Sequence, residues 1–122
     1  MENTLRAPRI PLTSDAAVHL GGELILCRTW DISTTGMSLV CPYRRRTSRP
    51  VTVEFFLSKE SGWLRIEANL IRSESFIGGF IWGIQFKQLD DKAACSIESH
   101  ILRRLVQEAV GLPGIEPQVA MA

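Results

Sequence analysis

The residues best suited to chemistry lie in one short segment that runs from Trp30 to Gly36. It contains a carboxylate, a hydroxyl and a glycine in the pattern Asp-x-Ser-x-x-Gly. Asp31 can accept hydrogen bonds from N–H donors, Ser33 can bind an anionic oxygen, and Gly36 lets the backbone approach a ligand closely. The same residue types also make ordinary turns through side-chain to backbone hydrogen bonds, so the pattern by itself leaves both interpretations open.

Two arginines near the N-terminus form a second candidate group. Arg6 and Arg9 have no acidic residue between them, and Pro8 and Pro11 flank Arg9. A guanidinium fork matches the O6 and N7 acceptors of guanine, stacks on purines and pairs with phosphate. Because of its prolines, the segment 1–14 is predicted to be an irregular, flexible arm that carries these arginines.

The composition excludes several classes of partner. A net charge of +1 lacks the basic excess that DNA or RNA binding requires, and no run approaches the ~20 apolar residues of a membrane span. Three cysteines at wide spacings indicate neither a disulfide framework nor a metal site, and His19 and His100 have no ligands at metal spacing. Nothing resembles a nucleophile elbow. We therefore expect a cytoplasmic protein that is not an enzyme, uses no metal or cofactor and does not insert into membranes.

The remaining sequence predicts six strands and one helix. Period-two alternation is clearest over residues 51–58, 64–70 and 80–86, and further strands are expected over 16–20, 23–32 and 37–41, the second of them central. From Asp90, a plausible N-cap, apolar residues recur at helical spacing as far as Gly111. Evenly spaced strands joined by short turns favour a closed antiparallel barrel. The predicted fold is mainly β: a six-stranded antiparallel barrel over 15–111 with one C-terminal helix, a flexible arm over 1–14 and a loose tail over 112–122.

Three features of this chain occur in a fixed order along it. The arm holds Pro8-Arg9-Ile10-Pro11, the Asp31 segment precedes Met37-Ser38-Leu39, and Gly83-Ile84-Gln85-Phe86 ends the last strand before the helix. In this order they resemble the PilZ domain family, bacterial receptors for cyclic di-GMP. The resemblance implies a six-stranded barrel with a C-terminal helix and cyclic di-GMP as the ligand.

The resemblance also implies which residues bind. Arg6 and Arg9 would close over the ligand, and Asp31, Ser33 and Gly36 would form its floor. Independently of the resemblance, Trp30 next to Asp31 is a candidate additional contact that could stack on a base, although a tryptophan on an alternating strand is more often a core or rim residue. The family spaces its two arm arginines four positions apart, whereas here Arg9 matches the second arginine and Leu5 occupies the place of the first.

Two functions follow from this comparison. The first is a cyclic di-GMP receptor that orders its arm on binding and signals to a protein partner in motility, exopolysaccharide or biofilm control. The alternative is a PilZ-like adaptor that binds no dinucleotide and docks onto pilus or flagellar proteins. The displaced arginine favours the adaptor, and the intact segment from Asp31 to Gly36 favours the receptor.

Overall fold

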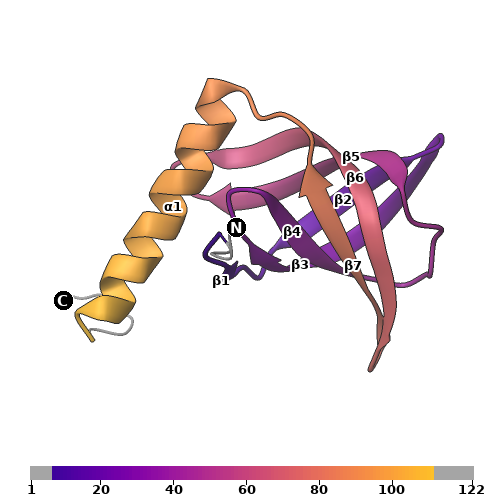
Figure 1. Cartoon of the computed structure of the whole chain (residues 1–122), viewed down its shortest axis with the longest axis horizontal. Helices are drawn as coiled ribbons and strands as arrows, with labels where there is room; N and C mark the ends of the chain where they lie inside the picture. Colours follow the sequence, from indigo (N-terminus) through magenta and orange to yellow (C-terminus); the bar gives the residue numbers. More distant parts are fainter. Residues whose placement is uncertain (1–6, 112–122) are drawn as a thin grey trace, which may run out of the picture.

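The computed structural model describes residues 7–111, and within them it contains seven strands and one helix. The strands are β1 (Ile10–Pro11), β2 (Asp15–Leu20), β3 (Glu23–Ile32), β4 (Gly36–Cys41), β5 (Arg49–Ser58), β6 (Gly62–Phe76) and β7 (Gly79–Phe86), and the helix is α1 (Asp91–Ala109). Figure 1 shows the strands curling into a barrel, with α1 standing at one end of it beside β1.

All strand pairs are antiparallel, and the sheet closes on itself. The order is β1-β3-β2-β5-β6-β7-β4, and a further pairing of β3 with β4 joins the two sides. Strands β2 to β7 therefore form the closed six-stranded barrel that the sequence predicts. Closure removes the unpaired strand edges that an open sheet of this size would expose.

The barrel interior is the hydrophobic core. Strand β5 shows the pattern most clearly, because Val51, Val53, Phe55 and Leu57 point inward and are at most 4% exposed. Each such side chain stabilises the fold by about 1.5–3 kcal/mol through the apolar surface removed from water. Trp82 is fully buried, and its indole N–H donates to the carbonyl oxygen of Tyr43 at 2.9 Å.

The helix begins where the sequence predicts. Asp90 is the N-cap, and its carboxylate accepts from the backbone N–H of Ala93 at 2.7 Å. Ile97 and Ile101 are buried against the core and Leu105 packs partly against it, whereas residues 106–111 are exposed. The helix thus packs on the barrel as far as Leu105, and its C-terminal end extends beyond it (Figure 1).

The arm differs from the prediction within its described part. Residues 10 and 11 form β1, which pairs with the end of β3 through Ile10 to Ile32 and Pro11 to Asp31. Ile10 is 1% exposed and Leu12 7%, so their burial in the core holds this segment against the barrel. Proline is tolerated there because β1 is an edge strand. The expectation that all of 1–14 is irregular is therefore wrong for residues 10 and 11.

Strand β3 is hydrogen-bonded along both of its edges, but only one of its faces is buried. It lies between β4 on one side and β1 and β2 on the other. Its inner face is buried, whereas Leu24 and Leu26 on its outer face are 57% and 71% exposed. The outer surface of the barrel is therefore open along this strand.

Candidate functional site

Asp31 reaches the outer surface of the barrel because β3 contains a bulge. Cys27 and Thr29 point inward, and strict alternation would aim residue 31 inward as well. The pairing of β3 with β4 shifts its register between Thr29 and Asp31, so that Ile32 becomes the next buried residue. One extra residue in the strand thereby leaves Trp30 and Asp31 together on the outside, as bulges do near functional sites.

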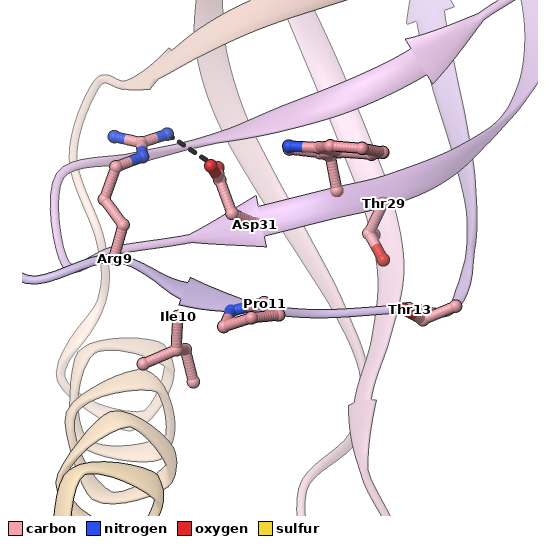
Figure 2. Close-up of a pocket in the computed structure, with 7 residues that line it drawn as sticks. Arg9, Ile10, Pro11, Thr13, Thr29 and Asp31 are labelled. Carbon is pink, nitrogen blue, oxygen red and sulfur yellow. Dashed lines mark hydrogen bonds and ion pairs between the residues drawn. The ribbon is translucent and has the colours of Figure 1, made fainter. Parts of the chain in front are cut away.

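Arg9 lies directly over this carboxylate. Its Nη2 atom donates to Oδ1 of Asp31 at 2.9 Å and to the hydroxyl oxygen of Ser38 at 3.3 Å. Figure 2 shows the two charged side chains pointing toward one another, while Ile10 points away from them on the other side of the strand. The Arg9 and Asp31 side chains are 34% and 23% exposed. An ion pair this open to water contributes about 0–1 kcal/mol, so a ligand can displace it at low cost.

Two hollows flank the Arg9 and Asp31 pair. One, of about 410 Å³, is lined by the arm and by Thr29, Trp30 and Asp31 (Figure 2). The other, of about 350 Å³, lies across β4, β7 and β6. Arg9 and Asp31 line both, which makes this pair the centre of the candidate site.

A row of four paired residues forms the floor of the second hollow. Strand pairing places Asp31, Ser38, Gly83 and Arg72 in one row across four strands. The two middle members have the smallest side chains of the row, and the longer side chains of the two arginines lie over them: Arg9 bonds the Ser38 hydroxyl, and Arg72 runs across Gly83. The floor thus has a carboxylate at one end and a guanidinium at the other.

Ser33 lies inside the turn between β3 and β4. It is fully buried, and its hydroxyl accepts from the backbone N–H groups of Thr35 and Gly36, each at 3.2 Å. The backbone N–H of Ser33 also donates to the carbonyl oxygen of Gly36 at 2.8 Å. The structure therefore gives Ser33 a turn-forming role, and a direct contact with a ligand stays a prediction.

Gly36 lines the second hollow, but packing also requires a glycine there. A Cβ at this position would overlap the backbone carbonyl oxygen of Ile84 on β7. Any side chain would push β4 and β7 apart. The glycine of the motif is thus explained by the close approach of two strands, with or without a ligand.

The remaining predicted site residues are Trp30 and Arg6. Trp30 is 50% exposed, lines the first hollow and meets Phe76 edge-on at 5.2 Å between ring centroids. Its indole is accessible to a base. Arg6 lies outside the described residues.

Sequence reasoning did not place Ser38, Arg72 or Gln85 in the site. All three line the second hollow, and they come from three different strands. The one local signal was Gly83, which interrupts the alternation of β7 and marks a close approach above it. Which residues lie opposite Gly83 on the neighbouring strands depends on how the strands of the barrel pair.

Fold and site together define the class of protein, a small β-barrel domain with a charged hollow on its outer face. The chain belongs to the PilZ domain family, whose family model matches residues 4–107. A search of curated protein sequences finds no match.

Solved structures agree with this fold. YcgR from Escherichia coli in complex with c-di-GMP superimposes with a TM-score of 0.73 at 18% identity, covering 88% of this chain and 49% of that one. The Bacillus subtilis inhibitor of motility MotI/DgrA gives 0.73 at 13% identity, covering 88% and 53%. The present chain spans about half the length of these two proteins. The PilZ domain of E. coli YcgR with c-di-GMP gives 0.67 at 14% identity, covering 90% and 99%.

Residues 7–111 contain neither a membrane-spanning helix nor a cluster of metal ligands. Within this range the helix is not apolar enough to cross a membrane. The same residues contain no cluster of three or more His, Cys, Asp or Glu side chains arranged to hold a metal ion.

Proposed function

We propose that this chain is a receptor for cyclic di-GMP and that the dinucleotide binds on the outer face of the barrel. It would lie between Arg9 and the row of paired residues Asp31, Ser38, Gly83 and Arg72. The observation that carries the proposal is the partly exposed Arg9 and Asp31 pair, set between two hollows. It offers a guanidinium and a carboxylate side by side, at a point where water or a ligand can reach both.

The chemistry of the ligand matches these groups. Cyclic di-GMP carries two guanines and two phosphates. A carboxylate such as Asp31 can accept from the N1 and N2 donors of guanine, an arrangement that adenine lacks, and Arg9 can pair with a phosphate or the guanine acceptors. Trp30 adds an exposed aromatic ring on which a base can stack. Guanine should therefore be preferred over adenine.

Binding would be transmitted through the arm and a protein partner. Arg9 immediately precedes β1, which Ile10 and Leu12 already hold against the barrel, so the ordering step of this proposal concerns the arm on the N-terminal side of Arg9. Ordering a residue costs roughly 1–2 kcal/mol, which several simultaneous contacts must offset. Leu102 and Val106 on α1, together with Val110 at its C-cap, are each more than half exposed and offer an apolar surface to a partner.

The same apolar surface also supports the alternative, an adaptor that docks onto another protein without binding the dinucleotide. Both functions use α1, but only the receptor needs the Arg9 and Asp31 pair. Ligand binding therefore separates them.

The experiment is isothermal titration with cyclic di-GMP and with cyclic di-AMP, comparing wild type with an Arg9→Ala, Asp31→Ala double variant. The matched control is Arg28→Ala, Asp15→Ala, which removes an ion pair of similar length, 2.8 Å, that is more exposed and joins β3 to β2. We expect selective binding of cyclic di-GMP by wild type and control and its loss in the site variant. No heat at high micromolar ligand with folded wild type would refute the receptor and leave the adaptor.

A further inference from the structure

Arg72 and Asp31 are the two end residues of the row that forms the floor of the second hollow. Strand pairing aligns Asp31 with Ser38, Ser38 with Gly83, and Gly83 with Arg72. Arg72 and Arg9 line one hollow, so the described part of the site contains two guanidinium groups rather than the single one that the arm supplies.

A second bulge brings Arg72 to the outer surface. Ile66, Ala68 and Leu70 of β6 point inward, and strict alternation would aim residue 72 into the core, where an unpaired charge is strongly unfavourable. The register between β6 and β7 shifts between Leu70 and Arg72, which turns the arginine outward. The bulge in β3 does the same for Asp31. Two separate bulges therefore place both end residues of the row, Asp31 and Arg72, on the outer surface.

The side chain of Arg72 packs directly on Gly83. A Cβ at position 83 would be 3.1 Å from the Cβ of Arg72, 3.4 Å from its Nε and 3.5 Å from its Cζ. The side chain thus runs across the bare backbone of β7 and carries its guanidinium over the floor. A larger residue than glycine would lift the arginine away from this surface.

Arg72 is held loosely enough to bind. Its side chain is 49% exposed, and its ion pair with Glu74 is long, with 3.8 Å between Nε and Oε1. A pair of this kind on one strand contributes little, so a ligand can take over the guanidinium without a large loss.

We propose that Arg72 supplies the second guanidinium for the dinucleotide, in place of an arginine at the position of Leu5, and binds a phosphate or the face of a guanine. This inference rests on the proposed function. The residues that line the second hollow include two guanidinium groups and one carboxylate, and their net positive charge suits a ligand that carries two phosphates. The planar fork of arginine serves either contact, whereas a lysine offers only a point charge.

The test is titration of cyclic di-GMP into Arg72→Ala and Arg72→Lys. The matched control is Arg65→Ala, an exposed arginine on the same strand that pairs with Glu54 at 2.7 Å. We expect Arg72→Ala to weaken binding by about tenfold or more, the scale of one well-formed arginine contact. Arg72→Lys should retain only part of the affinity, and Arg65→Ala should bind as wild type does. Melting temperatures of all variants should stay close to wild type, because these side chains lie on the surface.

The outcomes separate the two proposals. If wild type binds and Arg72→Ala binds equally well, the role of Arg72 is refuted and the receptor stands. If folded wild type does not bind, both proposals fall. An equal loss in Arg65→Ala would mean that Arg72 acts only through general surface charge, which also refutes the specific contact.

Discussion

The buried hydroxyl of Ser33 allows the turn to be tested separately from the ligand. In Ser33→Ala the backbone N–H groups of Thr35 and Gly36 both lose their acceptor. Thr35 is exposed, so water can replace its partner, but Gly36 is buried and its N–H would stay unsatisfied. One unsatisfied buried donor costs about 1–3 kcal/mol.

We therefore expect Ser33→Ala to lower the free energy of unfolding by about 2 kcal/mol, which for a domain of this size lowers Tm by roughly 10 °C. The measurement is thermal unfolding followed by circular dichroism. Thr35→Ala is the matched control: its hydroxyl lies 3.2 Å from that of Ser33, but Thr35 is exposed and water can replace this contact, so we expect a change in stability of less than about 0.5 kcal/mol.

The same variant distinguishes the two roles of Ser33. At a temperature where it remains folded, the turn role predicts affinity for cyclic di-GMP within a few-fold of wild type. A Ser33→Ala variant that melts with wild type but loses the ligand would refute the reasoning from the turn and place the hydroxyl on the dinucleotide.

Two further predictions concern groups away from the site. Burial, followed by repulsion from Arg104, lowers the pKa of His100 below its usual 6.5. The unfolded chain therefore binds this proton more readily, so the free energy of unfolding should fall as pH drops from about 6.5 through the folded pKa, and His100→Gln should flatten this slope in denaturant titrations. Cys27 and Cys41 are buried with their sulfur atoms 2.9 Å apart, and this hydrogen bond together with burial raises the pKa of Cys41, whereas Cys95 is exposed. A thiol reagent should label one cysteine in the folded protein and three after unfolding.

Each of these two predictions can be contradicted by its experiment. If the free energy of unfolding depends on pH in the same way for wild type and His100→Gln, another group causes the loss of stability at low pH. Labelling of Cys27 or Cys41 at the rate of Cys95 would show that the barrel opens near β3 and β4 far more often than its burial indicates.

Local sequence was enough for most of the secondary structure. The alternation of β5 and the N-cap of α1 at Asp90 depend on neighbouring residues only, and both are confirmed. Gly21 and Gly22, a pair of residues typical of tight hairpins, adopt the positive φ angles that such a turn needs, 57° and 85°. Period and turn chemistry are local properties, so a sequence can reveal them.

Only the tertiary structure decided how the site is assembled. Strict alternation would have put both Asp31 and Arg72 inside the barrel, and two bulges, visible only in the pairing of strands, turn them outward. The burial of Ser33 and the need for glycine at position 36 arise from contacts with a turn and with β7. Arg9 was recognised from its place in the arm, but Arg72, 63 positions further along the sequence, joins it only because β3, β4, β7 and β6 close side by side. Side-chain types can be read from the chain, whereas the face on which each one lies depends on register, which is set by partners distant in the sequence.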